Sequence, residues 1–259
     1  MPSGKREASS IIYIAPYDCA TVSFAELASA NVVGYTASNL PNGFSAAAPT
    51  FVNTGAEALN IKDIVALNAD GETEGGGVFQ LQTKAPSGGT DEQFMYLFED
   101  DVGEDLGDGW YNGDGETLAT KNFKPGEGFV FNSAVTGGKI QFAGEVYTKP
   151  LNITLPNGFC ALGNARPVAV PIQNIIPVNA DGETVGGGVF QLQTKAPSGG
   201  TDEQFMYLFE DDVGEELGDG WYNGDGETLA TKVFEPGEGF VFNSSITGGF
   251  LKFAGLNLQ

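Results

Sequence analysis

The residues best suited to chemistry are the oxygen-bearing side chains of a six-residue motif, Asn-X-Asp-Gly-Glu-Thr, which occurs four times. Oxygen ligands at alternate positions, with a glycine that allows a sharp turn, are what a calcium-binding loop requires. The candidate calcium ligands are Asn68, Asp70, Glu72, Asn112, Asp114, Glu116, Asn179, Asp181, Glu183, Asn223, Asp225 and Glu227. The alternative is a hairpin turn without metal, because Asx-Gly pairs form such turns readily and no motif continues with EF-hand spacing. We therefore expect no cofactor, and calcium is the alternative.

The only two tryptophans lie in a second motif, Gly-Trp-Tyr, which contains Trp110 and Tyr111 in one copy and Trp221 and Tyr222 in the other. Aromatic rings beside carboxylates can form a platform for a sugar. Trp and Tyr are equally suited to cap a hydrophobic core while their polar ends stay in water. We favour the core cap and keep the sugar platform as the alternative.

The rest of the sequence gives little support to catalysis. The chain has no histidine, which removes the commonest general base. Carboxylates are abundant, but no spacing singles out the acid and base of a glycosidase. The glycine-rich runs at 75–77 and 186–188 are not followed by the Lys-Ser/Thr of a phosphate-binding loop. We therefore expect a protein that is not an enzyme.

These motifs belong to a block that occurs twice. Residues 68–144 recur as 179–255 with about nine substitutions, at an offset of 179 − 68 = 111 residues. This period has the length of a small domain and is too long for a solenoid repeat. A Leu-Pro-Asn-Gly-Phe turn recurs at a larger offset, 155 − 40 = 115, which puts about four extra residues in the first copy, within 45–67.

Short strand-like segments separated by turn sequences fill each copy. Residues 78–82 alternate apolar and polar side chains, residues 94–98 are apolar on both faces and should form a central strand, and Lys124–Glu127 reads as a type II turn. No segment has a convincing helical period. The sequence therefore predicts an all-β chain of two tandem β-sandwich or barrel-like domains, at 31–146 and 147–259, preceded by an extended arm at 1–30.

The composition restricts the partners. The net charge is −22, which argues against nucleic acid and anionic membranes because both need basic patches. No stretch approaches the ~20 apolar residues of a membrane helix, so no membrane span is expected. The arm is β-prone, and it could fold back on its own domain or add as a strand to the sheet of a neighbouring molecule.

The segments NVVGYT, LPNGF, GDGWYNGDGE, PGEGFVF and QFAGEV together resemble a family of secreted proteins from bacteria of the Verrucomicrobia–Kiritimatiellae–Lentisphaera branch. The resemblance covers nearly all of residues 31–255. It implies export and an extracellular, cell-surface location, and it supplies no activity and no catalytic residues. The N-terminal arm departs from the family, because Asp18 and Glu26 interrupt the apolar run of an export signal.

Differences between the copies suggest a contact surface. Glu74, Asn122 and Lys139 are replaced in the second copy by apolar residues, and these could bury a surface against the first domain or the next subunit; drift is the alternative. A contact between unlike patches does not close and can build a filament. The candidate assembly contacts are Ile11, Ile12, Tyr13, Ile14, Val185, Val233 and Phe250. Cys19 and Cys160 could cross-link subunits, pair within one chain or remain thiols.

We therefore expect a non-enzymatic extracellular structural protein that assembles with itself, head to tail, into a filament or surface fibre. A secreted carbohydrate-binding module, with or without calcium, is the alternative.

Overall fold

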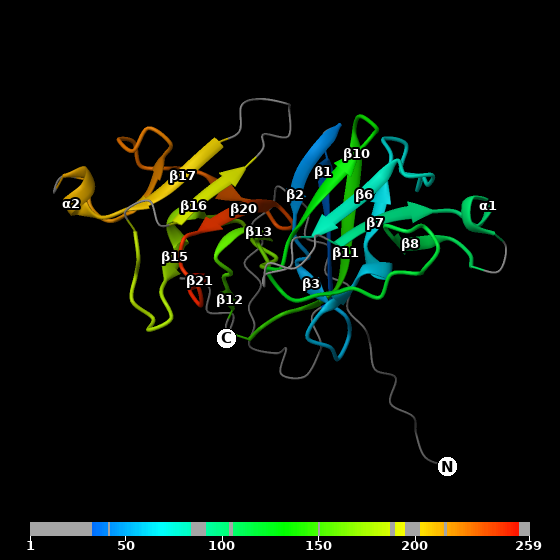
Figure 1. The fold of residues 1–259 in the computed structure, drawn as a ribbon, viewed down its shortest axis with the longest axis horizontal. Helices are drawn as coiled ribbons and strands as arrows, with labels where there is room; N and C mark the ends of the chain where they lie inside the picture. Colours follow the sequence, from blue (N-terminus) through cyan, green and yellow to red (C-terminus); the bar gives the residue numbers. More distant parts are fainter. Residues whose placement is uncertain are drawn as a thin grey trace, which may run out of the picture.

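The computed structural model describes residues 33–40, 42–83, 92–103, 106–149, 151–186, 190–194, 203–214 and 217–253 (Figure 1). Nearly all of its regular structure is antiparallel β-sheet, which confirms the all-β prediction.

In the first copy the elements are β1 (Val33–Leu40), β2 (Gly43–Ala47), β3 (Phe51–Val52), β4 (Leu59–Asn60), η2 (Ile61–Asp63), β5 (Val65–Leu67), β6 (Phe79–Thr83), β7 (Glu92–Leu97), α1 (Glu99–Val102), β8 (Gly109–Asn112), β9 (Asn122–Phe123), β10 (Phe129–Ser133) and β11 (Gly138–Val146). In the second copy they are β12 (Asn152–Thr154), β13 (Gly158–Gly163), β14 (Val170–Pro171), η3 (Ile172–Asn174), β15 (Ile175–Val178), β16 (Phe190–Thr194), β17 (Glu203–Leu208), α2 (Glu210–Val213), β18 (Gly220–Asn223), β19 (Val233–Phe234), β20 (Gly239–Ser244) and β21 (Phe250–Phe253).

Two sheets face each other in the first copy. The larger has the order β2-β10-β6-β7-β8, and in the smaller β11 pairs with β1 on one side and with β3 and β5 on the other. Their inward side chains alternate along the strands, as in β10, where Phe129 and Phe131 are buried. The ring of Phe129 lies 6.3 Å from that of Phe142 on the opposite sheet, so the core is the filling of a sandwich.

The second copy repeats this arrangement. Its five-stranded sheet has the order β13-β20-β16-β17-β18, and its smaller sheet has the order β12-β21-β15. The buried apolar side chains form two separate clusters, one in each copy. No sheet closes into a barrel within the described residues, so of the two predicted architectures the sandwich fits.

Several local predictions can be compared with these strands. The alternating segment 78–82 corresponds to β6, whose Phe79 and Leu81 are buried, as predicted. The segment 94–98 corresponds to β7, which pairs with β6 on one side and with β8 on the other, so it is an interior strand of the sheet, as predicted. The region 45–67, which contains the extra residues of the first copy, includes strand β3, and β3 pairs with the end of β11 through Val52 and Glu145.

The structure contains only short helical turns in its described part. None of them is long or apolar enough to cross a membrane. The short acidic turn α1 begins where Asp101 accepts a hydrogen bond from the backbone N–H of Phe98, at 3.1 Å. The Asp101 carboxylate therefore caps the local backbone.

Candidate functional site

Both Gly-Trp-Tyr motifs are buried, so the sugar-platform alternative is wrong for these residues. Trp110 is 2 % exposed and Trp221 is fully buried, as are Tyr111 and Tyr222. The indole N–H of Trp110 donates to the carbonyl oxygen of Ile64 at 2.9 Å, so its polar end is satisfied inside the protein. The core-cap prediction is correct in placing these rings on the core. No ring face of either motif is open to a ligand.

The four Asn-X-Asp-Gly-Glu-Thr motifs form turns that use their own oxygen atoms. In the first, the side-chain oxygen of Asn68 accepts from the backbone N–H groups of Asp70 and Glu72, at 3.0 and 2.9 Å. In the second, Asp114 accepts from the N–H groups of Glu116 and Thr117, at 2.9 and 3.1 Å. The later copies repeat these contacts through Asn179 and Asp225. Such Asx turns need no metal.

The other candidate ligands do not gather around these oxygens. In the part of the chain that the structure describes, no group of three or more Asp, Glu or Cys side chains is placed to hold a metal ion. Calcium binding by the remaining candidate ligands Asn112, Asp181, Glu183, Asn223 and Glu227 stays a prediction.

The substitutions between copies have partners inside the second copy. Val185 packs against the core of its own copy, whereas its counterpart Glu74 accepts a hydrogen bond from Asn68 at 2.8 Å. Phe250 lies opposite Val178, which is 1 % exposed, so the ring helps to cover a neighbouring side chain on the same sheet face. Neither residue requires an outside partner to explain its apolar character.

The third substitution belongs to a matched pair. In the first copy Asn122 lies opposite Asn60, and their side chains share a hydrogen bond of 3.0 Å. In the second copy Val233 lies opposite Pro171, so an apolar pair replaces a polar one. Val233 is 41 % exposed and is the only one of the three that presents a large apolar surface to solvent.

The remaining assembly candidates lie mostly outside the described residues. Ile11, Ile12, Tyr13, Ile14 and Cys19 all precede residue 33. Cys160 is 3 % exposed and belongs to the core of the second copy. A cross-link through its sulfur would require that core to open.

The two copies meet through a contact that the sequence analysis missed. The backbone N–H of Gly163 donates to the carbonyl oxygen of Gly126 at 3.2 Å, and that of Ala48 donates to Gly237 at 3.1 Å. Gly237 is the counterpart of Gly126 (126 + 111), and Gly163 is the counterpart of Ala48 (48 + 115). The contact is therefore pseudo-two-fold, because each copy offers the same Pro-Gly-Glu-Gly turn to the same strand end of the other.

Glycines make this junction possible. A Cβ atom on Gly128 would lie 2.7 Å from the carbonyl oxygen of Leu162, and one on Gly239 would lie 2.5 Å from the backbone nitrogen of Ala47. At these distances the two backbones could not approach. The sequence predicted the type II turn at Lys124–Glu127 but not its role in this contact. Gly126 has a φ of 81°, and the backbone N–H of Glu127 donates to the carbonyl oxygen of Lys124 at 2.9 Å, as in a type II turn.

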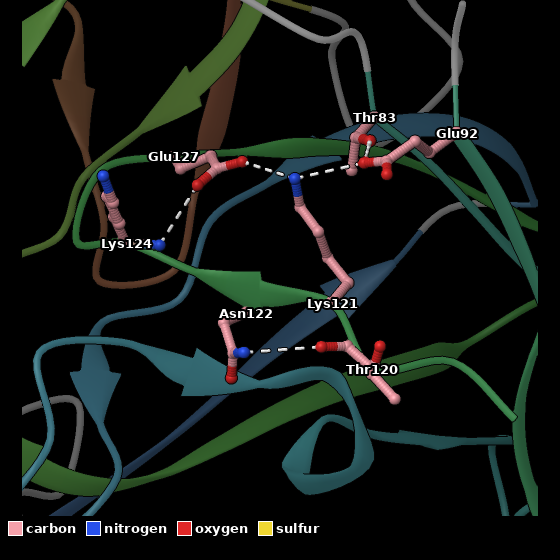
Figure 2. A network of polar contacts seen from close by, with 7 residues as sticks. All are labelled: Thr83, Glu92, Thr120, Lys121, Asn122, Lys124 and Glu127. Atoms are coloured by element: carbon pink, nitrogen blue, oxygen red, sulfur yellow. Dashed lines mark hydrogen bonds and ion pairs between the residues drawn. The ribbon is translucent and has the colours of Figure 1, made fainter.

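A lysine holds in place each Pro-Gly-Glu-Gly turn of the junction, at 125–128 and 236–239, which we call the docking turns; Figure 2 shows the network around the first of them. The Lys121 ammonium lies 2.9 Å from a Glu127 carboxylate oxygen and 3.1 Å from Glu92. The other Glu127 oxygen accepts from the backbone N–H of Lys124 at 3.2 Å. In the second copy Lys232 contacts Glu238 at 2.6 Å. This network positions the turn that docks on the other copy.

Strand β1 lies at the outer edge of the smaller sheet of the first copy. It pairs with β11 over all eight residues, and no other described strand pairs with it. Its outward side chains Val33 and Tyr35 are 45 % and 49 % exposed. The hydroxyl of Ser38, near the other end, donates to the carbonyl oxygen of Pro236 in the second copy at 3.2 Å. The end with Val33 and Tyr35 is thus the open part of this edge.

An open depression of about 480 Å³ lies beside the segment that joins the copies. It is lined by the loop 53–58, by residues of the turn region that include Lys124, and by Tyr147 and Leu151. It contains one carboxylate, that of Glu57, which forms an exposed ion pair with Lys149. This arrangement offers no pair of carboxylates for acid and base catalysis.

The titrating groups predict a flat stability profile near neutral pH. The chain has no histidine, the side chain that titrates there. Backbone hydrogen bonds from Glu116 and Thr117 lower the pKa of Asp114, so its stabilising contribution exists above about pH 4 and is lost as the pH falls further. Burial raises the pKa of Tyr96, as does the charge of Asp108, so stability begins to fall above about pH 10, where the unfolded chain ionises first.

Calorimetry should therefore give melting temperatures that agree within about 2 °C between pH 6 and 8.5 and that decline below about pH 4 and above about pH 10. A step between pH 6 and 7.5 would contradict this assignment of the titrating groups.

Comparisons with protein-family models, with curated proteins and with solved structures find no match to this chain. The resemblance to secreted bacterial proteins stays a prediction.

Proposed function

We propose that this chain is a non-enzymatic structural protein that assembles head to tail in the extracellular space, with strand β1 as the receiving surface. The observation that carries the proposal is the outer edge of β1, with which only β11 pairs among the described strands, together with the exposed side chains of Val33 and Tyr35. Native proteins usually shorten or charge such edges, because unpaired backbone groups recruit another strand. An eight-residue edge with apolar side chains is suited to strand addition.

The donor in this proposal is the N-terminal arm of a second copy. Its segment Ile11–Ile14 is apolar and β-prone. The docking turns are already used in the contact between the two copies of one chain, and that contact is self-complementary and closes. A contact between an arm and β1 joins unlike surfaces and remains open, so it supports growth in one direction.

The double substitution Val33→Lys and Tyr35→Lys is expected to abolish polymers. Charge on an exposed edge opposes strand addition, whereas exposed substitutions change folding stability by only about 0.5 kcal/mol. Negative-stain electron microscopy and light scattering of the full chain would measure the loss. The matched control is Leu118→Lys with Leu229→Lys, two other exposed apolar side chains, at 45 % and 39 % exposure.

Filaments that persist in the β1 variant, or a wild-type chain that stays monomeric at high concentration, would overturn the proposal. If the arm instead pairs with its own β1, the wild type is monomeric and the β1 variant melts at a lower temperature than the control.

A further inference from the structure

Three adjacent strands of each five-stranded sheet lack charge in a chain whose net charge is −22. Strands β2, β6 and β10 contain no charged residue, and neither do their counterparts β13, β16 and β20. Charged residues are common on exposed sheet faces, so six uncharged strands indicate a face that meets a neutral partner.

The uncharged side chains form rows across the strands. In the first copy Asn132 lies opposite Phe44 on one side and opposite Gln80 on the other. Phe44 is 51 % exposed. In the second copy Asn243 lies opposite Phe159, which is 45 % exposed. Each copy thus places an exposed ring beside an amide at equivalent positions.

The surface is hollowed where the copies meet. A groove of about 140 Å³ is lined by Gln82, Thr83 and Val130 of the first copy and by Phe159, Cys160, Ala161 and Val241 of the second. Every one of these side chains is uncharged. The groove therefore continues the neutral surface from one copy to the other.

We propose that this surface binds a neutral polysaccharide. Sugar rings have apolar C–H faces that pack on aromatic rings, and their hydroxyl groups both donate and accept hydrogen bonds. Asn and Gln side chains match them because one amide supplies two donors and an acceptor. A second copy of this acidic chain is a poorer occupant, since it would bring many like charges close to this face.

The duplication favours a ligand with a repeating structure. A polymer chain can occupy both rows at once, and the second contact is then made at a high effective concentration. This use of the molecule goes beyond self-assembly and employs strands other than β1.

The test measures retention of the full chain on insoluble cellulose and chitin, and its mobility in gels that contain soluble neutral β-glucan or galactomannan. We expect one or more of these probes to bind the wild type. Phe44→Ala and Phe159→Ala should each weaken binding by about 100-fold, because either change removes bivalent attachment. The two together should abolish it. Leu118→Ala with Leu229→Ala is the matched control, and it should bind as the wild type does.

A second pair of variants, Asn132→Asp and Asn243→Asp, adds charge to the rows without removing a ring and should also abolish binding. Failure of all four probes to bind, equal binding of an anionic polysaccharide, or binding unchanged in the double phenylalanine variant would each overturn the proposal. If the double phenylalanine variant loses filaments and the wild type binds no glycan, the neutral surface is occupied by a second copy of the chain instead. Loss of filaments in the β1 variant with glycan binding retained would separate this site from the assembly surface.

Discussion

Trp221→Ala is expected to lower the free energy of unfolding of the second copy by about 3–5 kcal/mol. The side chain is fully buried, and its ring lies 5.5 Å from that of Tyr207 in an edge-to-face contact. Its indole N–H donates to the carbonyl oxygen of Ile175 at 2.6 Å. The substitution leaves a large cavity and an unsatisfied buried acceptor, and both destabilise the fold.

Denaturant unfolding followed by fluorescence can assign this effect to one copy. The variant keeps Trp110 as its only tryptophan, and this residue reports on the first copy. If the copies are two domains that unfold separately, the unfolding curve followed by circular dichroism becomes biphasic. The midpoint of the unfolding curve followed by Trp110 fluorescence stays near its wild-type value. Trp110→Ala should give the converse result, in which the first copy is destabilised and the midpoint followed by Trp221 fluorescence stays near its wild-type value.

Leu229→Ala is the control, because this side chain is 39 % exposed and should change stability by about 0.5 kcal/mol or less. A loss below about 1 kcal/mol in Trp221→Ala would contradict the structural role assigned to this side chain.

Gly239→Ala is expected to separate the two copies without unfolding them. The added Cβ would lie 2.5 Å from the backbone nitrogen and 2.6 Å from a carbonyl carbon of the facing strand, at Ala47 and Ala46. Backbone cannot move aside as a flexible side chain can, so the cost should reach about 3 kcal/mol. Small-angle X-ray scattering should show a larger radius of gyration, while the far-ultraviolet circular dichroism remains that of folded strands.

Gly128→Ala should have the same effect from the other side of the pseudo-two-fold axis. Gly109→Ala is the matched control, because its Cβ would meet only the exposed side chain of Leu118, at 3.3 Å. An unchanged radius of gyration in both junction variants would show that the copies do not depend on this contact.

The fold class and many turns could be predicted from sequence because their causes are local. Alternation of apolar side chains located β6, and a Pro-Gly pair located the turn around Gly126. The docking role of that turn could not be predicted, because its partner Gly163 is distant in sequence and belongs to the other copy. A hairpin turn and a docking turn have the same local sequence.

The substitutions between copies show a second limit. Val233, considered alone, gives no indication that a second residue changes with it. Its cross-strand partner also changes, from Asn60 to Pro171, at the same offset of 171 − 60 = 111 residues. This signal was present in the sequence, but the strand pairing was needed to recognise which residues change together.

The pseudo-two-fold junction has a consequence for behaviour on dilution. Two separate molecules that met through such a small backbone contact would part at low concentration. Here the segment between β11 and β12 is short, so each copy meets the other at an effective concentration on the order of millimolar. This local concentration does not fall when the protein is diluted, so the paired form of the chain remains intact in any volume.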